Sequence, residues 1–90
     1  MRRVRVIISG RVQGVFFRAR TEQTAVSLNL KGWVRNLGNG DVEAVFEGNE
    51  EDIEKMLSWC REGPRLAKVK QVDVIDETYT GEFDRFSIRY

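Results

Sequence analysis

The segment Gly38-Asn39-Gly40 lies near the middle of the 90-residue chain, between two runs in which apolar and polar residues alternate. Because Asn and Gly tolerate the positive φ that tight turns require, this segment predicts a β-hairpin. The alternation predicts strands over 33–37 and 42–47. On the second strand, Glu43 and Glu47 fall opposite the apolar face, and we expect them to meet solvent. The chain is therefore expected to fold around a central antiparallel pair.

A helical pattern lies on each side of this hairpin. The first covers 18–29, and the second begins after Asn49 as N-cap and ends at Gly63-Pro64. Alternation predicts three further strands, and a change of parity in the middle one of these predicts either a bulge there or burial of that strand on both faces. The order β-α-β-β-α-β plus a short last strand is the ferredoxin-like, split β-α-β arrangement of the α+β class, with both helices on one face of a mostly antiparallel sheet. The three further strands are 4–8, 68–76 and 86–90.

Two finer expectations concern the surfaces of these elements. Ala19, Val26 and Leu30 are expected to lie near the buried face of the first helix, with Ala25 and Leu28 widening that face. Arg2, Arg3 and Arg5 are expected to decorate an edge strand, because charged side chains there discourage pairing with another molecule.

The length and composition limit the class of protein. Ninety residues, 1–90, are expected to form one domain. The formal net charge of +1 argues against a nucleic-acid-binding protein. No apolar run approaches the roughly 20 residues that span a bilayer, and no signal-peptide pattern is present. We therefore expect a cytoplasmic protein with no membrane partner, and nothing in the sequence indicates more than a monomer.

The chain contains no histidine and a single cysteine, Cys60. The lack of histidine excludes a Ser-His-Asp triad, a Cys-His pair and nearly every catalytic zinc site. The position of Cys60 in the second helical pattern favours a role as a small buried hydrophobe. Any catalysis must therefore use Arg, Asn, Lys, carboxylates, hydroxyls and backbone groups.

A loop rich in glycine joins the first strand to the first helix. Gly10 and Gly14 precede the helix, and Arg18 stands at its start. Backbone N–H groups converge at such a loop and the helix dipole favours negative charge, whereas Arg18 would be repelled there unless an anion were bound. The loop lacks both the P-loop spacing and a nucleotide fingerprint, and its short length suits one phosphoryl group better than a nucleotide. The alternative is structural, with glycines serving the turn and apolar flanks entering the core.

Asn36 lies near the end of the second strand, beside Arg35. Neighbours on a strand point to opposite faces, so only one of the two can face the loop. In the predicted topology the first and second strands are parallel, and Asn36 then lies at the same sheet edge as the glycine-containing loop. Its neutral amide, both donor and acceptor, could hold a water molecule. The alternative is a polar strand end before a turn.

These residues resemble the acylphosphatase family. Gly10-Arg-Val-Gln-Gly-Val-Phe-Phe-Arg18 is similar to the first signature of that family, and Gly32-Trp-Val-Arg-Asn36 with Gly40-Asp-Val42 to the second. The resemblance implies hydrolysis of the carboxyl-phosphate bond of acyl phosphates without metal or cofactor. It further implies that Arg18 binds the phosphate and Asn36 positions the attacking water. The backbone amides expected to cradle the phosphate are those of Val12, Gln13, Gly14, Val15, Phe16 and Phe17.

Two other functions stay open at this point. The chain could be a non-catalytic acylphosphatase-like accessory domain, since such domains also occur fused to larger carbamoyl-transfer proteins. It could also be a ferredoxin-like RNA-binding module, although it lacks the aromatic pattern of such modules. The terminal carboxylate of Tyr90 is a candidate partner for an arginine. The physiological acyl phosphate is not determined, and no second pocket for an acyl group is evident.

Overall fold

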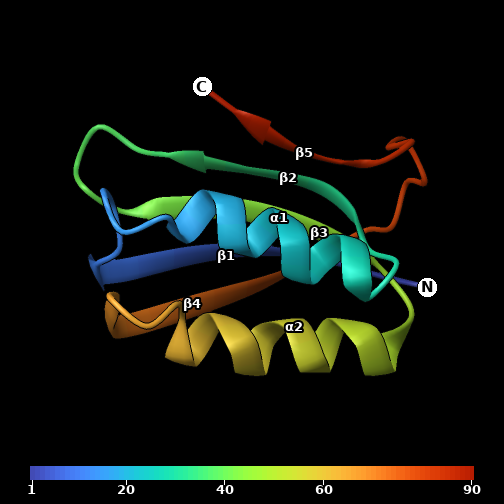
Figure 1. Ribbon diagram of the computed structural model, residues 1–90. Coiled ribbons are helices and arrows are strands. Elements are labelled where there is room, and N and C mark those ends of the chain that lie inside the picture. The colour runs from blue at the N-terminus through green and yellow to red at the C-terminus, as the bar shows by residue number, and fades with distance from the viewer.

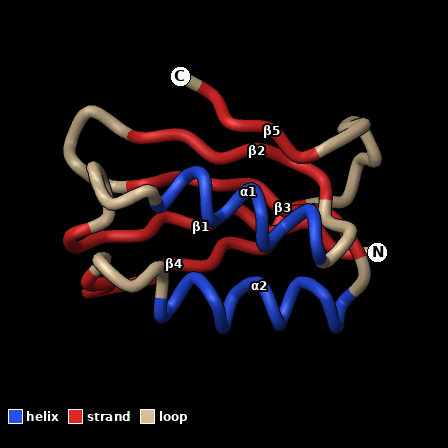
Figure 2. Tube along the Cα trace, viewed as in Figure 1, coloured by secondary structure: helices blue, strands red, loops and turns tan.

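In the computed structural model, which describes residues 1–90, two helices cover one face of a five-stranded sheet (Figure 1). The strand order is β4-β1-β3-β2-β5. All neighbouring strands are antiparallel except β2 and β5, which run parallel. The expected ferredoxin-like α+β class is confirmed, and the trace in Figure 2 shows the two helices lying side by side. The elements are β1 (Arg2–Arg11), α1 (Phe17–Ser27), β2 (Lys31–Asn36), β3 (Val42–Gly48), α2 (Glu50–Glu62), β4 (Lys68–Glu77) and β5 (Phe86–Arg89).

The core lies between the helices and the sheet. Strand β1 contributes every second side chain, and α2 contributes a stripe at helical spacing, as the sequence pattern predicts. Cys60 belongs to this stripe, and burial raises the pKa of its thiol to about 12. That thiol is therefore protonated and inert at neutral pH. The fully buried members from these two elements are Val4, Val6, Ile8, Ile53, Met56 and Cys60.

The buried face of α1 differs in part from the expectation. Ala25 and Leu30 are buried as expected, but Ala19 and Val26 are exposed, and Phe17 and Thr21 are buried in addition. The helix begins one residue earlier than expected, which brings Phe17 into the stripe. The Thr21 hydroxyl donates to the Phe17 carbonyl at 2.7 Å, so a polar side chain can occupy a core position with its hydrogen bond satisfied.

The expectation that Glu43 and Glu47 meet solvent is wrong. Both are buried on the sheet face away from the helices. Glu43 accepts hydrogen bonds from Arg5 at 3.0 Å and from Arg35 at 2.7 Å, and Glu47 accepts one from Arg3 at 3.3 Å. The long arginine stems cover the carboxylates while their charges pair with them. Ion pairs therefore cover the sheet face away from the helices, and β3 is buried on both of its faces.

The N-terminal arginines do not decorate an edge, because β1 lies in the interior of the sheet between β4 and β3. Arg3 instead pairs with Glu77 at 2.9 Å and with Glu82 at 2.6 Å. The hydrogen bond from Arg3 holds the pKa of the Glu82 carboxyl below its usual value. These arginines therefore join β1 to β4 and to the segment that precedes β5.

The expected bulge is present where β4 pairs with β1. Ser9 pairs with Gln71 and Gly10 pairs with Val69, which leaves Lys70 as the extra residue. The extra residue returns the side chain before it to the core side of the sheet. The valines that pack there against the core are Val69, Val72 and Val74.

Position 32 requires glycine because β2 and β3 approach each other closely there. Its φ is +136°, and a Cβ atom there would lie 1.9 Å from the Val45 carbonyl oxygen. We expect Gly32→Ala to lower the free energy of unfolding by about 2–3 kcal/mol, because strained backbone and a clash add together. Urea denaturation would measure this change. Gly38→Ala is the control, since Gly38 has no atom within 4 Å of such a Cβ and no positive φ; equal stabilities of the two variants would contradict the argument.

Candidate active site

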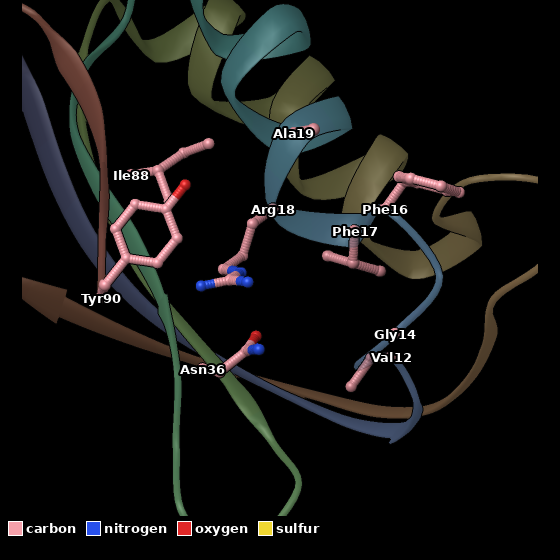
Figure 3. A pocket seen from close by; sticks show the side chains of 9 residues that line it. All are labelled: Val12, Gly14, Phe16, Phe17, Arg18, Ala19, Asn36, Ile88 and Tyr90. Carbon is pink, nitrogen blue, oxygen red and sulfur yellow. The ribbon is translucent and has the colours of Figure 1, made fainter.

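A pocket of about 300 Å³ opens where the β1–α1 loop, the end of β2 and the C-terminal residues meet (Figure 3). It brings together Arg18 and Asn36, as the topology argument predicts. Of the six loop residues expected to form a phosphate cradle, four line this pocket, and Gln13 and Val15 do not. The lining residues are Val12, Gly14, Phe16, Phe17, Arg18, Ala19, Asn36, Ile88 and Tyr90.

The loop backbone has the geometry of an anion cradle. Gly14 and Phe16 have φ values of 74° and 62°, while Val15 between them does not lie in the left-handed region. Such alternation turns successive N–H groups toward a common point. No backbone N–H from Gln13 to Ala19 donates a hydrogen bond to another protein atom. This row of free donors includes the first turn of α1, where the helix dipole also favours an anion.

Arg18 is the second residue of α1 and is half-buried. Its guanidinium forms no ion pair with a carboxylate, and it lies 4.8 Å from the centre of the Tyr90 ring. The expected pairing of an arginine with the terminal carboxylate is therefore replaced by a contact with the ring of the same residue. The side chain is held over the pocket with its donors available.

Asn36 is the last residue of β2, and its side chain points toward the guanidinium of Arg18 (Figure 3). Its Oδ1 atom is buried and has no hydrogen-bond partner in the protein. A buried acceptor of this kind is unfavourable unless something donates to it. Arg35 points to the other face, where it pairs with Glu43, so the two neighbours divide as the strand geometry predicts.

Comparison with known proteins identifies the family of this chain. The sequence model of the family described as Acylphosphatase matches residues 4–88. The chain belongs to the acylphosphatase family. The Acylphosphatase of Syntrophus aciditrophicus is 56% identical over 90 residues, which are 100% of this chain and 94% of that relative. The crystal structure of acylphosphatase from Bacillus subtilis has a TM-score of 0.96 at 36% identity, with 100% of both chains covered.

The chain matches proteins named Acylphosphatase at this level of sequence identity over its full length. It is therefore a hydrolase that acts on acyl phosphates. A similar unit also occurs in a longer protein. The structure of full-length HypF in its phosphate- and nucleotide-bound form has a TM-score of 0.85 at 30% identity. That match covers 99% of this chain and 12% of the HypF chain.

The side chain of Gln13 links the β1–α1 loop to the β2–β3 turn. Its Nε2 atom donates to the carbonyl oxygens of Leu37 at 2.7 Å and Asp41 at 2.8 Å. Leu37 follows Asn36 directly, so one amide holds the loop and the Asn36 strand end together. Sequence reasoning assigned Gln13 only a backbone role, because a contact across 24 residues leaves no local pattern.

Gln13→Glu tests this tether, because a carboxylate has nearly the same shape but cannot donate to the two carbonyls. We expect it to lower the free energy of unfolding by about 1–2 kcal/mol through the lost hydrogen bonds. Misplacement of the loop against Asn36 is expected to lower kcat by about tenfold or more. Gln23→Glu on the exposed side of α1 is the control. Unchanged stability and kcat in Gln13→Glu would contradict the role.

No three cysteine, aspartate or glutamate side chains lie close enough together to hold a metal ion. The groups that line the acylphosphatase pocket are instead a guanidinium, an amide, backbone donors and apolar side chains. Neither helix has the length and apolar character needed to cross a membrane.

Proposed function

We propose that Arg18 and the backbone N–H groups of residues 12–17 hold the phosphoryl group of the acyl phosphate, and that Asn36 positions the attacking water. The observation that carries this proposal is the unpartnered Oδ1 atom of Asn36, which lines the same pocket as the half-buried, unpaired Arg18. A water molecule that donates to Oδ1 would satisfy this acceptor. Its oxygen would then be directed at a phosphorus atom held by Arg18.

The chemistry suits these groups. Phosphoryl transfer passes through a loose transition state in which charge spreads over the equatorial oxygens, and the protein mainly positions and stabilises it. A planar guanidinium and convergent N–H groups meet those oxygens at fixed geometry. The leaving group is a carboxylate, a weak base that needs no general acid. The proton of the water can pass to a phosphate oxygen of the substrate, which is consistent with a chain that contains no histidine.

The test is phosphate release from benzoyl phosphate in the presence of excess EDTA. Rapid turnover under these conditions is expected, because every proposed contact with the phosphoryl group comes from protein. Activity that disappears with EDTA and returns with added metal would contradict the metal-free mechanism.

An accessory, non-catalytic role is the alternative from the sequence; the HypF match shows a similar unit within a longer chain and does not bear on catalysis. The same assay decides between the two. Binding of phosphate without turnover would assign the pocket to an accessory domain. A single domain of residues 1–90, a monomeric state, a location in the cytoplasm and the lack of nucleic-acid binding stay predictions from the sequence.

A further inference from the structure

A second hollow of about 460 Å³ lies on the other flank of the start of α1. It is bounded by that helix, by Trp59 of α2 and by the α2–β4 connection. Phe16, which precedes α1, lines both this hollow and the pocket that holds Arg18 and Asn36. The two hollows therefore adjoin at Phe16. The lining residues are Val15, Phe16, Arg20, Gln23, Thr24, Trp59, Pro64, Arg65 and Leu66.

The charge of this hollow is uncompensated. Two arginines, Arg20 and Arg65, line it, and no carboxylate does. Neither arginine belongs to an ion pair, and Arg20 donates only to the neutral amide of Gln23 at 3.3 Å. All nine ion pairs of the protein use other arginines: Arg2, Arg3, Arg5 and Arg35. Two unpaired guanidinium groups beside an anion site indicate a preference for a further negative charge.

The apolar part of the hollow is equally unusual. Phe16 is 73% exposed and Leu66 is 63% exposed, although both are large hydrophobic residues. Phe16 also has a left-handed backbone, which is unfavourable for an aromatic residue. Figure 3 shows its ring directed away from the Arg18–Asn36 centre. An extended apolar chain that leaves the catalytic pocket could pass over this ring.

We propose that this hollow binds the acyl portion of substrates that carry a second anionic group, a carboxylate or a phosphate, several bonds from the acyl carbon. The proposal rests on the proposed function, which places the phosphoryl group beside Arg18. In-line attack from the Asn36 side sends the leaving carboxylate away from Asn36. The acyl chain then crosses the start of α1. Because a helix is about 10 Å wide, an acyl chain of about five or six carbons is needed to reach the second hollow. Its methylene groups contact Phe16 and Leu66, and its terminal anion meets Arg20 and Arg65.

The test compares two acyl phosphates of equal chain length. Adipoyl monophosphate ends in a carboxylate, and hexanoyl phosphate ends in a methyl group. We expect the wild type to prefer adipoyl monophosphate in kcat/KM by about tenfold, at roughly two- to fivefold for each exposed arginine contact. The double variant Arg20→Gln/Arg65→Gln is expected to lose this preference and to hydrolyse hexanoyl phosphate as the wild type does.

Arg61→Gln is the matched control. Arg61 is exposed at the end of α2, on the same end of the molecule, but lines neither hollow. If Arg61→Gln lowers the preference as much as the double variant does, the effect is general electrostatic attraction and the proposal is overturned. An unchanged preference in the double variant, or none in the wild type, overturns it as well.

A binding measurement separates this proposal from the proposed catalytic mechanism. Calorimetry with the two corresponding phosphonates, in which a methylene group replaces the bridging oxygen, reports affinity without turnover. A carboxylate preference that depends on Arg20 and Arg65 supports the subsite even if hydrolysis fails. Equal affinities for the two phosphonates overturn it even if hydrolysis proceeds as proposed.

Discussion

Arg18→Gln is expected to lower kcat/KM for benzoyl phosphate by about a thousandfold or more, the contribution typical of an arginine that stabilises a phosphoryl-transfer transition state. Glutamine retains hydrogen-bond donors but loses the charge and the planar fork. The affinity for inorganic phosphate is expected to fall by roughly ten- to a hundredfold, because the hydrogen bonds of a charged group to an anion are worth about 1.5–3 kcal/mol. Steady-state kinetics and inhibition by phosphate measure the two effects.

The stability of Arg18→Gln is expected to remain close to that of the wild type. Arg18 has no carboxylate partner, and its guanidinium makes a cation–π contact with the exposed Tyr90 ring. Arg85→Gln is the control, since Arg85 likewise forms no ion pair but is exposed and lies outside the pocket. A loss of activity in Arg85→Gln equal to that in Arg18→Gln would assign the effect to net charge and not to the site.

Asn36→Ala is expected to lower kcat by about 10²–10³-fold, since water positioning and oriented polar groups contribute at this scale. KM is expected to change little, because the phosphoryl group is held by Arg18 and the loop and not by Asn36. The variant should be at least as stable as the wild type, because removal of an unpartnered buried oxygen breaks no hydrogen bond within the protein. Kinetics and thermal unfolding of the same preparation measure the three quantities together.

Asn39→Ala is the control for this variant. Asn39 lies in the β2–β3 turn, where its Oδ1 accepts from the backbone N–H of Asp41 at 3.0 Å. Its loss is expected to lower stability slightly and to leave kcat unchanged. If KM rises in Asn36→Ala while kcat stays constant, Asn36 binds substrate and does not position the water.

The order of elements and the fold class follow from the sequence alone. Alternation and helical spacing are local properties, and the turn at Gly38-Asn39-Gly40 joins two strands that can pair only as a hairpin. Once β1 and β2 are parallel with β3 between them, the end of β2 must lie beside the β1–α1 loop. For this reason the sequence predicts that Arg18 and Asn36, which are 18 positions apart, lie in one pocket.

The tertiary structure decided what those local patterns leave open. The buried face of α1 follows Phe17, Thr21 and Ala25, because a hydroxyl can be satisfied within its own helix and so tolerates burial. Glu43 is buried because arginines from neighbouring strands reach over it.

The link between Gln13 and the β2–β3 turn, and the contact of Arg18 with Tyr90, likewise join segments that are distant in sequence. A hydrogen bond between two loops, or a contact between a helix and the C-terminal residue, depends on strand register and side-chain reach. Neither of these has a period along the chain, so only the folded molecule reveals them.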